Sequence, residues 1–334
     1  MSASELSERA DGTPTRASET RLASQPTASA ATGKRREDAI VGASEATRRL
    51  IAQATAAARS DMPVWLTGPP GSDRDGAARA IHAWGPRARA EFSLLVCSAM
   101  PEALQERSLV GCAAGHYPAI PGTHVGALER AAGGTIFIDG VEALRPAVRD
   151  MLLHAVSLRR FRREGESGDR ALAARVVLGS DGAPTSPFMQ VPHHEIRLTP
   201  LAERREDVLA LAAHYLRTFS DEAGARAVGF TADARDALLE EAWSGDALEL
   251  RARIREAVRL NGDGAITAEA LLLARDKAPS FKEAKRAFER RYVSVLLRRC
   301  DGNISRAARL ARKDRKDFYD VLRRTGLDPS QFRD

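Results

Sequence analysis

Short apolar runs alternate with helical patterns between residues 40 and 200. The runs read PVWLTG, FSLLVCSA, GGTIFIDG and ARVVLGSD. Between them lie segments such as SEATRRLIAQATAAARS and GAARAIHAW, in which apolar residues recur at helical spacing. Short buried strands that alternate with helices are typical of a parallel α/β sheet, whose ligand loops lie at the carboxyl ends of its strands. The sequence therefore predicts an α/β core over residues 39–200.

After Pro200 the strand signals stop and the helical periodicity continues. The segments REDVLALAAHYLRTF, TADARDALLEEAW and LELRARIREAVRL carry apolar residues three or four positions apart. They predict a helical subdomain over residues 201–275, and the polar joint DKAPS then opens a third domain over 276–334. Residues 1–38 hold no aromatic side chain and no sustained apolar period, so we predict a disordered tail there.

The stretch GPPGSDRD, residues 68–75, joins the first apolar run to a helical pattern. A P-loop reads GxxxxGK[ST]: its glycines let backbone N–H groups wrap the phosphates, and its lysine reaches them as a point charge. Gly68 fits this pattern, but Asp73, Arg74 and Asp75 stand where the second glycine, the lysine and the hydroxyl residue belong. A carboxylate about 4 Å from a phosphate costs several kcal/mol even at an effective dielectric near 20. The stretch is either a tight strand-to-helix turn or a degenerate phosphate loop.

Positive charge is concentrated at the C-terminal end of the chain. Residues 281–334 carry 16 Lys and Arg against 8 Asp and Glu, a net charge of +8, which leaves −2 for the residues before them. Such an excess is the electrostatic footprint expected where a domain meets phosphates. On charge alone, a solvated helical face explains it equally well.

The sequence indicates neither a metal site nor a membrane span. Its three cysteines, Cys97, Cys112 and Cys300, show no CxxC spacing, and its seven histidines show no ligand spacing with carboxylates. No apolar run approaches the roughly 20 residues that a span needs, and no N-terminal signal is present. We therefore expect a cytoplasmic protein with no metal and no membrane partner.

Six stretches, in a fixed order, make the chain similar to one known family. They read IVGASEATRRLI, AARAIHAWGPRA, LVCSAMPEALQERSLVG, GALERAAGGTIFIDG, LTPLAERREDVLALAAHYL and GNISRAARL. Through them residues 40–330 resemble the bacterial enhancer-binding proteins, which activate sigma-54 RNA polymerase. The resemblance implies an AAA+-like P-loop core with a parallel sheet, a helical lid, and an all-α Fis-type helix-turn-helix domain.

The same resemblance implies that the nucleotide site is degenerate. The family's water-polarising glutamate falls on Gly140, its sensor asparagine on Asp181, and a later sensor arginine on Leu248. Residues 176–196 contain no arginine, although the family carries there the arginine fingers that stabilise the transition-state charge. We expect no catalytic residue and no cofactor; the alternative is a loop that still binds ATP with Mg²⁺ weakly. The degenerate site would consist of Gly68, Gly71, Ser72, Arg74, Asp139 and Asp181.

Residues 303–326 have the pattern of a helix-turn-helix. Asn303 is suited to cap a helix ISRAARLA, and Gly326 to end a second helix, RKDFYDVLRRTGL. Between the two helices, Arg312 takes a turn position where glycine is common. The apolar residues predicted to pack inside this module are Ile304, Ala307, Ala308, Leu310, Phe318, Val321 and Leu322.

A helix-turn-helix presents the first residues of its second helix to base edges, while flanking basic groups hold phosphates. We therefore assign Arg315, Lys316 and Asp317 to the bases, although the carboxylate departs from the small hydroxyl residue usual in the family. The alternative is a basic helical hairpin used for oligomerisation. The residues predicted to form the DNA-binding site are Asn303, Arg306, Arg309, Arg315, Lys316, Asp317, Tyr319, Arg323 and Arg324.

An apolar stripe precedes this module. Phe281, Phe288, Tyr292 and Val295 recur at spacings of 7, 4 and 3, which places them on one face of a helix. Such a face is suited to pairing with a second copy, or to packing on the chain's own recognition helices. A dimer would present two half-sites about one helical turn apart, so palindromic targets are expected.

These features lead to one hypothesis and two rivals. The hypothesis is a sequence-specific DNA-binding regulator whose non-hydrolysing core serves oligomerisation or partner docking. Its partners would be double-stranded DNA, further copies of itself, and an intact enhancer-binding relative or RNA polymerase. However, the family's sigma-gripping GAFTGA loop aligns with GHYPAI at 115–120 and keeps only its first glycine. The rivals are a divergent ATP-dependent activator of sigma-54 polymerase and an interaction scaffold without specific DNA binding.

Overall fold

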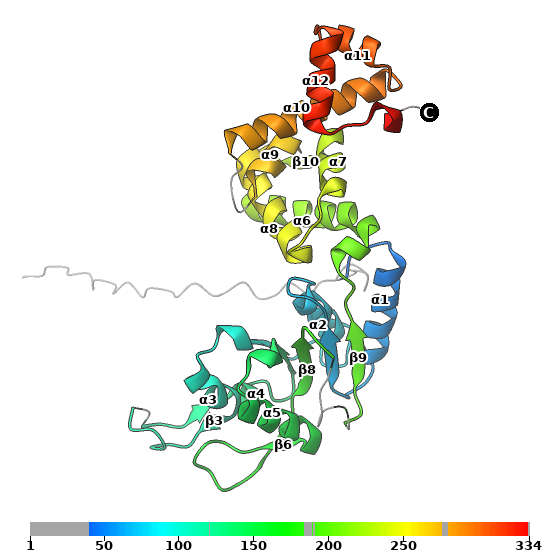
Figure 1. Ribbon diagram of the computed structural model, residues 1–334. Helices are drawn as coiled ribbons and strands as arrows, with labels where there is room; N and C mark the ends of the chain where they lie inside the picture. Colours follow the sequence, from blue (N-terminus) through cyan, green and yellow to red (C-terminus); the bar gives the residue numbers. More distant parts are fainter. Residues whose placement is uncertain (1–39, 120, 184–188, 190, 276–279, 333–334) are drawn as a thin grey trace, which may run out of the picture. The chain divides into compact units, whose positions relative to one another are not determined.

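The computed structural model describes residues 40–119, 121–183, 189, 191–275 and 280–332. The predicted tail, residues 1–38, and most of the DKAPS joint lie outside the described residues. Within the described part, the chain builds an α/β core, a mainly helical lid and a helical C-terminal module (Figure 1).

Five parallel strands form the central sheet, in the order β2-β5-β8-β1-β9. This confirms the predicted α/β fold with its parallel sheet. Strand β2 lies at one edge and leaves Leu94 and Val96 more than one-third exposed, whereas every residue of β1 and β8 is buried. The strands are β1 (Val64–Thr67), β2 (Phe92–Val96), β5 (Thr135–Asp139), β8 (Arg175–Ser180) and β9 (His194–Arg197).

Helices cover both faces of the sheet with two separate apolar clusters. On one face, Leu50 and Ile81 pack with Phe137 and Val177. That face is covered by α1 (Glu45–Ala58) and α2 (Arg74–Ala83). The other face carries α3 (Gln105–Val110), α4 (Ala127–Arg130) and α5 (Pro146–Leu158), with two small hairpins, β3–β4 (Gly111–Cys112, His124–Val125) and β6–β7 (Arg160–Phe161, Arg170–Ala171).

The predicted helical lid is confirmed, and it contains in addition two short strands that its sequence did not indicate. A pair of parallel strands, β10 (Ala227–Phe230) and β11 (Gly264–Ile266), lies between its helices. Both strands are short and contain glycine, so they show no alternation of apolar and polar residues, and packing against the lid core fixes them. The lid helices are α6 (Val208–Ala223), α7 (Ala232–Glu240), α8 (Asp246–Asn261) and α9 (Ala268–Leu273).

Three helices make up the C-terminal module: α10 (Phe281–Arg299), α11 (Ile304–Leu310) and α12 (Arg315–Thr325). A small cluster that includes Leu297, Ala307 and Phe318 holds them together. One predicted core residue is misplaced: Leu310 is 48% exposed, because the face of α11 that packs in the cluster is formed by Ala307, Ala308 and the partly buried Ile304 and Ala311.

Candidate functional site

The loop between β1 and α2 meets the ends of two neighbouring strands. The N–H of Gly68 donates to the carbonyl oxygen of Ser180, at the end of β8, over 3.2 Å. Asp73 adopts a left-handed conformation and caps α2 by accepting from the N–H of Gly76. Ser72 is buried, and its Oγ has no hydrogen-bond partner among the described residues. The loop therefore has both the place in the fold and the backbone turn of a phosphate loop.

Arg74 lies across this edge of the sheet and joins three parts of the chain. One Nη donates to the carbonyl oxygen of Gly68 and to Asp181 Oδ1, each over 2.7 Å, and Nε lies 2.8 Å from Asp139 Oδ1. The side chain is only 10% exposed. Burial by itself lowers the pKa of Arg74, but the hydrogen bonds and charges of Asp181 and Asp139 outweigh it, so the pKa is raised. The predicted site residues Gly68, Arg74, Asp139 and Asp181 thus come together around one guanidinium group.

The lid contacts the same loop directly. The N–H of Leu248 donates to the carbonyl oxygen of Gly71 over 3.0 Å, while the Leu248 side chain is 59% exposed. Gly71 has a φ of +88°, and a Cβ there would lie 2.4 Å from the carbonyl oxygen of Gly245. Both facts require glycine at this position. Leu248, which aligns with the family's later sensor arginine, therefore contacts the loop through its backbone and brings no charge to it.

The residue after Asp139 turns the chain sharply away from the sheet. Gly140 has a φ of +73°, and its N–H donates to the carbonyl oxygen of Gly179 over 2.9 Å. Glu142 follows in a short 3₁₀ turn, Val141–Ala143, and is exposed. No carboxylate other than Asp139 comes from this segment to meet Arg74 in the described structure.

The stretch aligned with the GAFTGA loop lies beside the β6–β7 hairpin. The Arg107 guanidinium lies over the Tyr117 ring, 5.1 Å from the ring centroid. A hydrogen bond with Glu164 raises the pKa of Tyr117. The N–H of Ala113 also donates to the carbonyl oxygen of Glu164. Ile120 lies outside the described residues.

The predicted DNA-binding residues of the C-terminal module gather on its surface. Asn303 caps α11, its Oδ1 accepting from the N–H of Arg306, so its side chain has a structural role already. Arg315 lies 5.8 Å from the ring centroid of Tyr319. The charged members are all exposed, namely Arg306, Arg309, Arg315, Lys316, Asp317, Arg323 and Arg324.

Two ion pairs involve residues of this surface. Arg324 pairs with Glu289 of α10 over 3.1 Å, which ties it to its own module. Asp320 was not among the predicted residues, yet it is exposed and pairs with Arg323 over 3.3 Å. It follows Lys316 by four residues and precedes Arg323 by three, and this spacing could have indicated a shared face.

The turn between α11 and α12 depends on one residue in the left-handed region. Arg312 has a φ of +52°, its N–H donates to the carbonyl of Arg309, and the N–H of Lys313 donates to that of Ala308. This is a Schellman closure, in which glycine is the usual residue at the left-handed position.

Arg312→Gly is therefore expected to stabilise the module by about 0.5–1 kcal/mol, because it removes the left-handed strain of a residue with a Cβ. Urea unfolding followed by circular dichroism measures the change. Lys313→Gly, at the next position, is the control and is expected to be neutral or destabilising. A loss of stability in Arg312→Gly would contradict the turn geometry.

The apolar stripe of α10 does not pack on α11 or α12. The contacts of α10 with α11 and α12 come from a different face, which includes Val293 and Leu297. The rings of Phe288 and Tyr292 stack on each other at 6.2 Å. All four stripe residues are exposed: Phe281, Phe288, Tyr292 and Val295.

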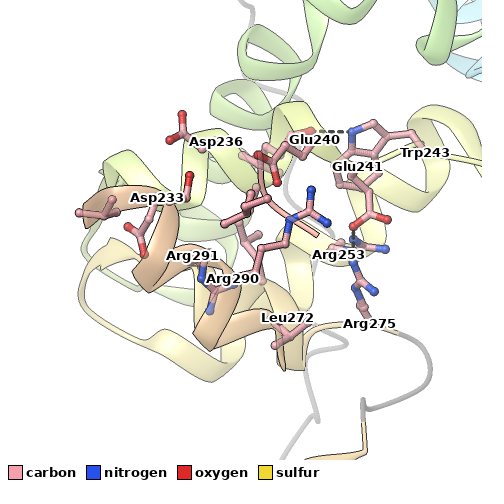
Figure 2. Close-up of a pocket in the computed structure, with 18 of the residues that line it drawn as sticks. Asp233, Asp236, Glu240, Glu241, Trp243, Arg253, Leu272, Arg275, Arg290 and Arg291 are labelled. Carbon is pink, nitrogen blue, oxygen red and sulfur yellow. Dashed lines mark hydrogen bonds and ion pairs between the residues drawn. The ribbon is translucent and has the colours of Figure 1, made fainter. Parts of the chain in front are cut away.

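A cavity of about 260 Å³ lies between the lid and α10 (Figure 2). The Trp243 indole donates to a backbone carbonyl and lies under the Arg253 guanidinium, which also pairs with Glu241. Across the cavity, Arg298 of α10 pairs with Asp236 of α7. The opposite charges lining this cavity largely neutralise one another through these pairs.

The described residues contain no group of three or more His, Cys, Asp or Glu side chains placed to hold a metal ion. They also contain no helix with the length and apolar character that crossing a membrane requires. Cys97 directly follows β2 and lies near Asp139, and burial raises the pKa of its thiol to about 12. It is therefore not a reactive thiol.

Comparison with known proteins identifies two domains. Residues 40–191 match the Sigma-54 interaction domain family, and residues 202–287 match the AAA+ ATPase lid domain family. Transcriptional regulatory protein GlrR of Escherichia coli (strain K12) is 30% identical over 318 residues, which cover 91% of this chain and 72% of that protein. The C4-dicarboxylate transport transcriptional regulatory protein DctD of Rhizobium meliloti (strain 1021) is 27% identical over 303 residues, covering 88% and 65%.

A solved structure supports the fold. NtrX from Brucella abortus, crystallised in complex with ATP, aligns with a TM-score of 0.63 at 24% identity, covering 86% of this chain and 70% of that one. At this identity the likeness concerns the arrangement of helices and strands.

Proposed function

Because the chain belongs to the family of transcriptional regulators with a sigma-54 interaction domain, we propose that it is a sequence-specific DNA-binding regulator with a non-hydrolysing core. Double-stranded DNA is its ligand, read by the α11–α12 module. A second copy pairs through the exposed stripe of α10, which makes palindromic sites the targets. The core serves as the body for oligomerisation or for docking an intact relative or the polymerase.

The exposed basic surface of α12 carries the DNA-binding part of the proposal. Lys316, Tyr319 and Arg323 lie three or four residues apart and are exposed, while Phe318 and Leu322 of the same helix are buried. The helix therefore presents its charged face outward from a fixed core. Positive groups on a helix of this kind fit the major groove and the phosphates beside it.

Three features of the core support the absence of hydrolysis. Gly140 offers no side chain to polarise water, and the nearest following carboxylate, Glu142, is exposed on the next turn. Leu248 offers no charge to a phosphate, and Asp139 is already paired with Arg74. The proposal therefore separates this chain from relatives such as NtrX, which was crystallised with ATP.

The first test is selection of duplexes from a random library by the full-length protein, followed by binding to the selected site at several salt concentrations. Arg315→Ala is expected to relax the preference at particular base pairs, at about 1–3 kcal/mol for a lost bidentate contact. Arg323→Ala is expected to weaken binding to all sequences and to reduce the slope of log K against log salt by about 1.

A matched control is Arg259→Ala, because Arg259 is an exposed lid arginine paired with Glu256. It should leave both the base preference and the salt slope unchanged. If no sequence is enriched, the scaffold alternative replaces DNA recognition. If Arg315→Ala keeps the full base preference, the recognition residues have been assigned incorrectly.

A further inference from the structure

We propose that Arg74 is a built-in cation that replaces the divalent metal at the edge of the sheet and, without nucleotide, holds the loop between β1 and α2 to the ends of β5 and β8. This role of Arg74 rests on the proposed non-hydrolysing core. It adds that the loop keeps one conformation at all times and is not regulated by a nucleotide. The family implies ATP with Mg²⁺ here, and the residues present do not fit that ligand.

The contacts of the guanidinium show the misfit. Arg74 donates hydrogen bonds to the Gly68 carbonyl and to Asp181, and its Nε forms an ion pair with Asp139. In a P-loop site the lysine leaves these groups free and reaches the phosphates, and an acidic residue helps to hold the metal. Here the one acidic residue that the resemblance assigns to the metal is paired with an arginine of the same chain.

The local charge also opposes a polyanion. Asp139 and Asp181 together carry two negative charges against the single positive charge of Arg74. The next basic residue of α2, Arg79, pairs with Asp75 over 2.9 Å and so adds no free positive charge. A triphosphate at this edge would meet a net negative cluster, and its own metal would have to displace a guanidinium from two carboxylates.

The lid contact needs no ligand either. The hydrogen bond from Leu248 to Gly71 joins two backbone groups, and Gly245 lies against the same glycine. In a nucleotide-controlled core, ligand contacts hold the lid and the loop together, and the ligand shifts the population of closed molecules. Here backbone contacts join the lid to the loop, and the Arg74 bridge joins that loop to the ends of β5 and β8.

The test compares thermal unfolding of the full-length protein with and without ATP and Mg²⁺. We expect the wild-type Tm to stay within about 1 °C, whereas a ligand at about 100 times its Kd would raise it by several degrees. Arg74→Ala removes the cation that both Asp139 and Asp181 contact. We expect its Tm to fall by about 5 °C or more, and Mg²⁺ or Mn²⁺ alone to recover part of the loss, because both cations prefer carboxylate oxygens.

Two further variants make the outcome decisive. Arg79→Ala removes the neighbouring arginine of α2, which is 54% exposed, and should neither lower the Tm comparably nor respond to cations. If Arg74→Ala does not fold, Arg74→Lys keeps the charge but loses the forked geometry, and it should unfold at a lower temperature than the wild type.

Each result has a distinct meaning. Saturable ATP–Mg²⁺ binding by the wild type, or an Arg74→Ala variant as stable as the wild type, overturns the role of Arg74. ATP binding without hydrolysis leaves the non-hydrolysing core standing, whereas measurable hydrolysis refutes that core. Failure to select DNA refutes DNA recognition and leaves the Tm comparison unaffected.

Discussion

Phe318→Ala is expected to abolish the proposed DNA binding by unfolding the C-terminal module while the α/β core stays folded. Phe318 is 1% exposed and is among the largest fully buried side chains of the chain. It packs in a cluster of its own, separate from the clusters of the sheet and the lid. Removing a buried phenylalanine ring costs about 3–5 kcal/mol, and a module of this size has little more stability than that.

Far-ultraviolet circular dichroism and DNA binding at one salt concentration measure both effects on the same sample. Leu310→Ala is the matched control, because Leu310 is an apolar residue of the same module that is exposed. It is expected to change stability by less than about 0.5 kcal/mol and to keep DNA affinity. Loss of DNA binding without loss of helix content in Phe318→Ala would show that Phe318 does not hold the module together.

Much of the α/β core could be predicted from sequence because its strands are buried on both faces. Runs such as VWLT and RVVLGS are continuous rather than alternating, and only a parallel sheet covered by helices on both sides requires that. Asn303 and Gly326 were predictable for a local reason as well: Asn303 caps the start of α11 and Gly326 caps the end of α12, each through a hydrogen bond to a residue three or four positions away.

The contacts of Arg74 could not be predicted in this way. Its partners Asp139 and Asp181 are 65 and 107 positions away along the chain, and only the strand order of the sheet brings their loops together. Spacing along the sequence predicted a degenerate phosphate loop but not the partners of Arg74. The same limit applies to β10 and β11, whose pairing depends on packing inside the lid.

Asp207 joins the lid to the start of α1 through a buried carboxylate. It is 0% exposed, and it lies in the 3₁₀ turn Arg205–Asp207, just before α6. Its Oδ1 accepts from the N–H groups of Ala43 and Ser44 over 2.6 and 2.8 Å. Its Oδ2 accepts from the hydroxyls of Ser44 and Thr47, each over 2.6 Å. A buried acceptor with four donors is costly to replace, because each donor left without its acceptor has no water molecule to bond to instead.

The Asp207 carboxylate is ionised well below neutral pH. Burial by itself raises the pKa of Asp207, but the hydrogen bonds from Ser44, Thr47 and Ala43 outweigh burial and hold the pKa below the ordinary value of 3.8. A carboxyl group with a lowered pKa stabilises the folded state above its unfolded pKa. That stabilisation is lost as pH falls through the folded pKa.

Asp207→Asn is therefore expected to lower the free energy of unfolding by about 2–4 kcal/mol at pH 7, because the amide replaces one acceptor atom by a donor that faces two hydroxyls. Urea unfolding at a series of pH values measures the difference from the wild type. That difference should be constant above pH 5 or so and should narrow below about pH 4, as the wild-type carboxylate takes up its proton.

Glu206→Gln, which neutralises the exposed carboxylate one residue earlier, is the control and should change stability by less than about 0.5 kcal/mol. A variant as stable as the wild type at pH 7, or a difference that does not narrow in acid, would show that the charge of Asp207 does not hold the lid to α1.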